Sequence, residues 1–279
     1  RDHSWLARLH ENETPCLSEV DTRALTLKLR EGGTPWGAIV EANSETEAKE
    51  KAKLLIVEKK KIDMDWVIAV SRTEIEERTG KKESGPIVGV LDFGCKENIL
   101  RELELRCSKV IIFPSRTNVD KLNQYALDGI LLSNGPGNPA AVQVATETVR
   151  ELLKLKSEKK KQLPIFGICM GHQILSLALG AKTYKLKFGH RGANHPIRDE
   201  LLKKTYVTSQ NHGYAVDAKT LPTHAQVTQT NLNDQTVAGI WSETLDCLGI
   251  QYHPESHPGP HDADGLFDFF VNKMIRSQK

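Results

Sequence analysis

The sequence has 279 residues, of which 39% are hydrophobic and 27% are charged, so the chain can bury one large core or two smaller ones. Its 38 lysine and arginine residues against 36 aspartate and glutamate residues leave a formal net charge of +2, which gives no reason to expect a nucleic-acid or acidic partner. Every apolar run is shorter than the roughly 18 residues that a membrane-spanning helix needs, which excludes such a span.

The cysteines are scattered and include no C-x-x-C pair, which predicts a reducing compartment, with the cytoplasm as the default, and no disulfide framework. Because the sequence starts at Arg1 and not at methionine, we expect a piece of a longer chain, and an organelle address on that longer form stays open. The lysine-rich tracts at 58–63 and 154–162 are typical of solvated faces or loops.

Residues 1–80 are charged and are predicted to be mostly helical. One helix is expected over 21–30, with Asp21 as its N-cap and a stop at Gly32-Gly33. A second is expected over 44–56, with Ser44 as its cap. The segment is too short and too interrupted to contain an evident core of its own.

From Gly85 onward, buried strands alternate with turns and helices. Four apolar runs predict strands at 87–93, 109–114, 129–133 and 163–168, and helical spacing predicts a helix at 140–155. Such alternation predicts an α/β domain over 85–279, with a mostly parallel sheet flanked by helices, after a partial smaller domain over 1–80. Ligands then bind beyond the carboxyl ends of the strands. Shorter strands are expected at 205–209, 225–229, 237–241 and 247–252, and a closing helix at 264–275.

The stretch LPIFGICMGHQILSLALG, residues 163–180, places Cys169 between two glycines, where a predicted strand meets a predicted helix. The pattern G-x-C-x-G is the thiol counterpart of the G-x-S-x-G nucleophile elbow, whose glycines remove Cβ clashes from a sharp turn. The helix dipole favours the thiolate there, and the amide of Met170 points to where an oxyanion would form. A cysteine packed at a strand end is the alternative that this motif leaves open.

A nucleophilic cysteine needs a base, and LGIQYHPES at 248–256 provides a histidine in a suitable context. Pro254 keeps His253 extended, and residues two apart in extended chain face one side, so Glu255 can hold the imidazole. The alternative is a surface His-Pro-Glu turn. A metal site made of His253, His257 and His261 would need a helix that the intervening prolines forbid, so we expect no metal.

A third motif, LLSNGPGNPAA at 131–141, follows the end of a predicted strand. Its alternating glycines and prolines predict a stiff loop whose backbone can approach a ligand closely. It lacks the lysine and the Ser/Thr of G-x-x-x-x-G-K-[ST], so it is not a phosphate loop. By itself it is an ordinary strand-to-helix turn.

These motifs, in this order, resemble the flavodoxin-like glutaminase domain of class I glutamine amidotransferases. Over nearly the whole chain, the resemblance narrows to the small, glutamine-hydrolysing chains of carbamoyl phosphate synthetases. It rests on these passages: EVDTRALTLKLRE, LDFGCKENILREL, LSNGPGNP, FGICMGHQILSLALGAKTYKLKFGHRGANHP, TSQNHGYAVD and GIQYHPESHPGPHDADGLFDFF.

The resemblance implies that Cys169 attacks the carboxamide of glutamine and forms a glutamyl thioester. It implies that His253 passes the protons, that Glu255 orients His253, and that water then releases glutamate. It also implies that seven residues meet the substrate: Gly135, Gly137, Met170, Gln173, Asn211, Gly213 and Tyr214. Four further histidines (172, 190, 195 and 212) are interpreted as structural.

The family passes ammonia to a large synthetase subunit, where it meets bicarbonate and ATP. We therefore expect no cofactor in this chain and place ATP and Mg in that large partner. Two other hypotheses remain: a non-catalytic structural or regulatory subunit, and a glutaminase that serves a different ammonia acceptor. The family's N-terminal domain also begins well before Arg1 and supplies one serine of the glutamine pocket. Asn138 stands where the family more often has aspartate, and Met170 where leucine is common.

Overall fold

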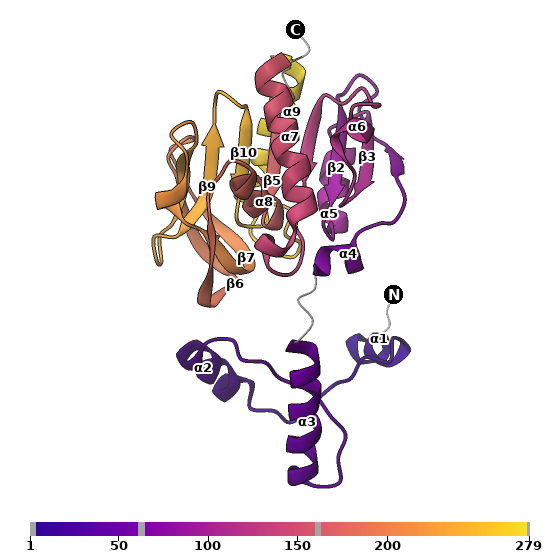
Figure 1. Cartoon of the computed structure of the whole chain (residues 1–279), viewed down its shortest axis with the longest axis vertical. Coiled ribbons are helices and arrows are strands. Elements are labelled where there is room, and N and C mark those ends of the chain that lie inside the picture. Colours follow the sequence, from indigo (N-terminus) through magenta and orange to yellow (C-terminus); the bar gives the residue numbers. More distant parts are fainter. Residues whose placement is uncertain (1–3, 61–64, 160–162, 278–279) are drawn as a thin grey trace. The chain divides into compact units, whose positions relative to one another are not determined.

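The structure, a computed structural model drawn in Figure 1, describes residues 4–60, 65–159 and 163–277. It divides into two compact units, residues 1–63 and 64–279, whereas the sequence predicted the boundary between 80 and 85. The division lies earlier because α4 (Trp66–Val70) buries Val67 in the core of the second unit and β1 (Glu76–Thr79) pairs with a strand of its sheet. Strand β1 was not predicted, whereas the other elements described within residues 1–80 are helices, as expected.

The first unit consists, within residues 4–60, of α1 (Trp5–Glu11), α2 (Thr22–Gly32) and α3 (Glu45–Lys60). Both predicted N-caps are confirmed. Asp21 accepts a hydrogen bond from the amide of Ala24 at 2.8 Å, and Ser44 accepts one from Glu47 at 3.2 Å. Gly33 is the one buried residue in this described range, so the three helices enclose no core of their own.

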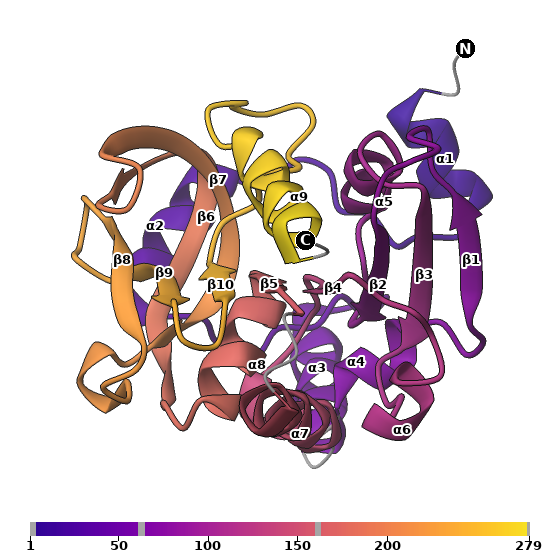
Figure 2. The ribbon, with the colours of Figure 1, turned by 90° about the horizontal axis from the view of Figure 1, so that it is seen from above.

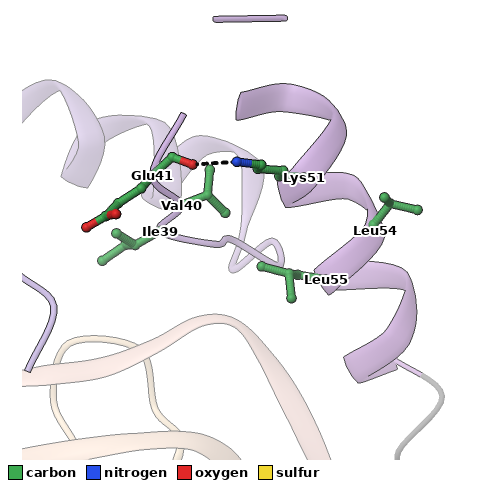
Figure 3. A pocket seen from close by; sticks show the side chains of 6 residues that line it. All are labelled: Ile39, Val40, Glu41, Lys51, Leu54 and Leu55. Atoms are coloured by element: carbon green, nitrogen blue, oxygen red, sulfur yellow. Dashed lines mark hydrogen bonds between the residues drawn. The ribbon is translucent and has the colours of Figure 1, made fainter. Parts of the chain in front are cut away.

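An open hollow of about 440 Å³ lies within the first unit, between α3 and the extended segment that precedes it (Figure 3). Lys51 donates a hydrogen bond from Nζ across it to the carbonyl oxygen of Glu41 at 3.0 Å. The apolar side chains of this unit therefore line an open surface. The lining residues are Ile39, Val40, Glu41, Lys51, Leu54 and Leu55.

The second unit contains a parallel set of strands, β2 (Ile87–Asp92), β3 (Lys109–Pro114), β4 (Gly129–Leu132), β5 (Ile165–Ile168) and β10 (Cys247–Ile250). Antiparallel strands extend this set: β1 beyond β3, and on the other side β6 (Thr183–Asp199), β7 (Lys204–Val216), β8 (Gln226–Asn231) and β9 (Val237–Ser242). Together they form one sheet in the order β1-β3-β2-β4-β5-β10-β9-β8-β6-β7.

Helices cover both faces of the sheet, as Figure 2 shows. On one face lie α5 (Glu97–Glu104) and α9 (Gly265–Ser277), and on the other α6 (Val119–Leu122), α7 (Gln143–Lys159) and α8 (Met170–Ala178). Each face has its own apolar cluster, with Phe267 and Leu100 on the α5 and α9 side and Val149 and Ile174 on the α7 and α8 side. The predicted α/β sheet with flanking helices is confirmed, since its central strands are apolar runs buried on both faces.

Strand β6 is the largest element that the sequence did not predict, and only residues 205–209 of its partner β7 were expected. Most of the side chains of β6 are polar or partly exposed, so the segment has no apolar period. It is a strand because it pairs with β7 along most of its length, with irregularities after Lys185 and Gly192. A pairing of this kind depends on the tertiary fold.

Lys156 corrects the expectation that the tract 154–162 is solvated. Its side chain lies on α7 and the residue is 7% exposed. Nζ donates hydrogen bonds to the carbonyl oxygens of Leu163 at 2.6 Å and of Leu245. This ammonium group therefore joins α7 to the start of β5 and to the β9–β10 turn. Residues 160–162 of this tract, and 61–63 of the other one, lie outside the described residues.

The sheet order brings the carboxyl ends of β2, β4, β5 and β10 to one edge, because these neighbouring strands are parallel. The segments that follow them carry the predicted motifs: Cys169 after β5, the loop 134–139 after β4, and His253 with Glu255 after β10. None of the helices in the described residues is long and apolar enough to cross a bilayer.

Candidate active site

Cys169 lies on the turn between β5 and α8, so the predicted strand–turn–helix is confirmed. Its backbone has φ 54° and ψ −101°, and a positive φ of this kind is rare for a residue with a side chain. Its amide donates to the carbonyl oxygen of Ile250 at 2.8 Å, which ties the turn to the end of β10. The residue is 5% exposed, and Met170 beside it begins α8 with an amide that has no acceptor inside the helix.

The glycines of the elbow are needed for close backbone packing. A Cβ atom on Gly167 would lie 2.6 Å from the carbonyl oxygen of Gly171, so the turn closes only when residue 167 has no side chain. The amide of Gly171 donates to the carbonyl oxygen of Ser133 at 2.9 Å. These contacts hold the start of α8 against the ends of β4 and β5.

His253 and Glu255 meet as their spacing predicted. Nδ1 of His253 lies 2.7 Å from Oε1 of Glu255. Because Nδ1 faces the carboxylate, Nε2 is the ring nitrogen that is left for another partner, and Cys169 is close enough to shift the pKa of the ring. Burial lowers the pKa of His253, but the charge of Cys169 and the contact with Glu255 together raise this pKa to about 10. The surroundings of His253 therefore favour its protonated, imidazolium form.

Lys96 is a neighbour of this pair that sequence reasoning missed. Its Nζ lies 3.4 Å from Oε1 of Glu255 and 3.2 Å from Nδ1 of His253. Burial raises the pKa of Glu255, whereas the hydrogen bond and charge of His253 and the charge of Lys96 lower it, and the net direction is down. Glu255 is therefore ionised. The signal was available, since Lys96 follows the end of a predicted strand.

Asp92, the last residue of β2, fixes the loop that carries Lys96. The carboxylate is 1% exposed and accepts the amides of Cys95 at 2.7 Å, Arg72 at 2.8 Å and Gly94 at 2.9 Å. The guanidinium of Arg72 adds a contact at 3.0 Å. Burial raises the pKa of Asp92, but these hydrogen bonds outweigh it and lower the pKa below its usual range.

The loop after β4 packs closely on the loop after β2. A Cβ atom on Gly135 would lie 2.3 Å from the carbonyl oxygen of Phe93, and Gly137 has φ 94°. Asn134 joins the two loops through hydrogen bonds to the carbonyl oxygen of Gly94 at 3.1 Å and from the amide of Lys96 at 3.0 Å. Glycine is therefore required at 135 by the close contact with Phe93 and favoured at 137 by the positive φ. The substrate contacts of Gly135 and Gly137 stay predictions.

Two buried glutamines extend the site, and one of them, Gln251, was not predicted. Gln173 donates through Nε2 to the carbonyl oxygen of Tyr214 at 2.9 Å and to Oε1 of Gln251 at 3.0 Å. Gln251 in turn donates through Nε2 to Sγ of Cys169 at 3.8 Å. The chain of contacts connects β7 to the sulfur through α8 and the segment after β10.

The remaining predicted substrate residues lie on β7. Asn211 is exposed and pairs with Arg191 in the ladder with β6, while Gly213 and Tyr214 are half-buried. The carbonyl oxygen of Tyr214 accepts a hydrogen bond from Nδ1 of His212 at 2.8 Å, in addition to the one from Gln173. The structure thus links Tyr214 to the elbow helix, and the substrate roles of these residues stay predictions.

The four histidines that were interpreted as structural (172, 190, 195 and 212) have low pKa values or contacts with other side chains. Burial lowers the pKa of His172 to about 3, and burial with the nearby His190 lowers that of His212 to about 3, so both rings are neutral at ordinary pH. His190 contacts Asp234 at 2.7 Å, and its ring lies next to that of His195. Within the described part of the chain, no group of three His, Cys, Asp or Glu side chains is placed to hold a metal ion.

The chain is similar to known proteins in sequence and in fold. The family Glutamine amidotransferase class-I matches residues 89–273. The carbamoyl phosphate synthase small chain of Chlorobaculum tepidum is 42% identical over 97% of this chain and 72% of its own length. That of Thermosynechococcus vestitus is 43% identical over 95% of this chain and 71% of its own. The crystal structure of a protein from Thermoplasma acidophilum, assigned as part of a GMP synthase, has a TM-score of 0.60 at 22% identity, covers 71% of this chain and 98% of its own, and supports the fold.

Proposed function

The chain belongs to the carbamoyl phosphate synthase small chains, within the class I glutamine amidotransferases, and from this premise we propose that it hydrolyses glutamine through Cys169, His253 and Glu255. The observation that carries the proposal is the position of Cys169. Cys169 is the N-cap residue of α8, and it is close enough to His253 to raise the pKa of an imidazole that Glu255 holds at Nδ1. A cysteine that only packs in a core does not need a histidine and a carboxylate beside it, whereas a nucleophilic cysteine does.

In the first half of the reaction, Sγ of Cys169 bonds to the side-chain carboxamide carbon of glutamine. The oxygen of the tetrahedral intermediate meets the amide of Met170 at the positive end of α8. The C–N bond then breaks, and the imidazolium of His253 gives its proton to the departing nitrogen, which leaves as ammonia. The product bound to the enzyme is a glutamyl thioester.

In the second half, the now neutral His253 takes a proton from water, whose oxygen attacks the thioester carbon. The C–S bond breaks, glutamate forms, and the sulfur returns as a thiolate beside the reformed imidazolium. Glu255 keeps the ring in one orientation and stabilises its positive charge in both halves. Atoms and protons balance once the new side-chain carboxyl group releases its proton: glutamine and water give glutamate, ammonia and one proton.

The proposed recipient of the ammonia is a large synthetase subunit, which is where we place the ATP, the Mg and the formation of carbamoyl phosphate. The family to which the chain belongs supports this partner, because a small chain implies a large one. The seven predicted substrate residues (135, 137, 170, 173, 211, 213 and 214) would bind glutamine. A cytoplasmic location, expected from the unpaired cysteines, remains a prediction.

The test is a glutaminase assay of the chain, alone and with a large synthetase subunit, for the wild type and Cys169→Ser. The variant should lose activity by about a thousandfold or more and keep its fold. Cys107→Ala, which alters a buried cysteine between α5 and β3, is the matched control and should stay active. A diazoketone analogue of glutamine should label only Cys169. Equal glutaminase activity in the wild type and in Cys169→Ser would refute the proposal and favour a non-catalytic subunit.

A further inference from the structure

Gln251 places a hydrogen-bond donor against the sulfur of Cys169. The residue follows β10, two positions before His253, and is 1% exposed. Its side-chain Nε2 lies 3.8 Å from Sγ of Cys169. Its backbone N–H donates a hydrogen bond to the carbonyl oxygen of Ala238 at 2.9 Å. The side chain is therefore enclosed and fixed at its base, with its carboxamide directed at the proposed nucleophile.

The orientation of this carboxamide follows from its neighbours. A backbone carbonyl can only accept, so the carbonyl oxygen of Tyr214 requires that Gln173 present its NH2 group, which lies 2.9 Å away. The same NH2 group lies 3.0 Å from Gln251, so the atom it meets must be the oxygen of that side chain. The NH2 group of Gln251 is then left to face Cys169. Reversing Gln251 would set two donors against each other.

We propose that Gln251 donates a hydrogen bond that stabilises the anionic sulfur of Cys169, and that Gln173 is the positioning residue that keeps this donor aimed. The inference rests on the proposed role of Cys169 as the nucleophile. A hydrogen bond to an anion is stronger than one between neutral groups, and it is stronger still at a buried site, where the effective dielectric constant is low. Both N–H bonds of Gln173 are already used, so only its oxygen is free to meet glutamine.

The test compares Gln251→Met with the wild type. Methionine keeps the length and fills the space but has no donor. Alkylation of Cys169 by iodoacetamide, without glutamine and resolved by peptide mass analysis, should be about tenfold slower at pH 7, with its pH profile displaced to higher pH. The glutaminase kcat should fall by a similar factor with KM within about twofold, because the sulfur and not the substrate loses a partner.

Three further variants make the result specific. Gln251→Glu keeps the oxygen that Gln173 needs and adds a negative charge beside the sulfur, so alkylation should be slower than in Gln251→Met. Gln173→Met frees Gln251 to turn and should give an intermediate loss. Gln229→Met is the matched control: Gln229 is equally buried but donates to Asp199, and its loss should leave alkylation of Cys169 unchanged. Thermal unfolding of each variant establishes that it is folded.

The outcomes separate this inference from the proposed function. Wild-type alkylation and kcat in a folded Gln251→Met would overturn the inference, whatever the glutaminase activity of the wild type. Slow alkylation in Gln251→Met, together with a wild type that has no glutaminase activity, would support the donor and refute the function. An equal loss in Gln229→Met would show a general effect of buried glutamines and would also overturn the inference.

Discussion

A Cβ atom on Gly171 would lie 2.0 Å from the carbonyl oxygen of Leu132, the last residue of β4. The start of α8 therefore lies directly on the end of a neighbouring strand, with no room for a side chain between them. This approach holds Cys169 at the edge of the sheet, where the loop after β4 and the segment after β10 also end.

Gly171→Ala should disrupt the elbow. The obstacle is backbone, so α8 or β4 must shift, and we expect the free energy of unfolding to fall by about 3 kcal/mol. Because the shift moves the sulfur away from His253, glutaminase activity should fall by about a hundredfold. Urea unfolding and a glutaminase assay measure both effects. Gly265→Ala, at the open start of α9, is the control and should leave both values near the wild type.

Glu255→Gln should narrow the pH range of activity. The substitution keeps an oxygen for Nδ1 of His253 but removes the charge that helps to raise the pKa of the imidazole to about 10. The alkaline limb of the kcat profile should therefore move to lower pH, and kcat at pH 8 should fall roughly 10- to 100-fold. Asp264→Asn, which alters the exposed carboxylate beside His261, is the matched control. An unmoved alkaline limb would contradict the role given to Glu255.

Asp92→Asn should destabilise the second unit, because the amide NH2 group would face the donors of Arg72. We expect a loss of about 3 kcal/mol at pH 7 in urea unfolding. The pKa of Asp92 is lower in the folded chain than in the unfolded one, so its contribution is present above about pH 4 and is lost as the pH falls through the folded value. The difference in the free energy of unfolding between the wild type and Asp92→Asn should therefore become smaller at acidic pH. Asp268→Asn, at an exposed pair with Arg106, should cost under about 1 kcal/mol.

Lys156→Met should remove a pH dependence of stability. Burial lowers the pKa of Lys156 from 10.5 to about 8 in the folded chain. Between those two values, the unfolded chain binds a proton that the folded chain lacks, so the stability of the wild type rises with pH in this window. Relative to Lys156→Met, the wild type should thus gain free energy of unfolding from pH 8 to 10.5. Lys204→Met, at an exposed lysine, is the control. A constant difference across the window would contradict the prediction.

The parts of the fold that sequence predicted are those whose cause is local. The caps Asp21 and Ser44 act within one helical turn, and Gly167 meets the backbone of Gly171 within one bend. What it did not predict depends on which strands become neighbours. Lys96 and Gln251 follow β2 and β10, and the sheet order brings Lys96 to His253 and Gln251 to Cys169.

Lys156 shows the same limit from another direction. The lysines of the tract 154–162 are alike in sequence. The sequence alone did not predict that Lys156 would be the one to meet the carbonyl oxygens of Leu163 and Leu245. Strand β6 is a further case, because its polar residues carry no period and its partner β7 decides its conformation. The site predicted from motifs was therefore a minimal set, to which tertiary structure adds the supporting residues.

The order of the strand ends along the chain has a consequence for biosynthesis. A ribosome makes Cys169 well before it makes His253, and the turn that bears the cysteine is pinned at its amide by Ile250 of β10, also a late segment. A nascent polypeptide that has reached only α8 thus carries the proposed nucleophile without its proposed base. Under the proposed function, the chain could act on glutamine only after the last parallel strand has packed beside β5.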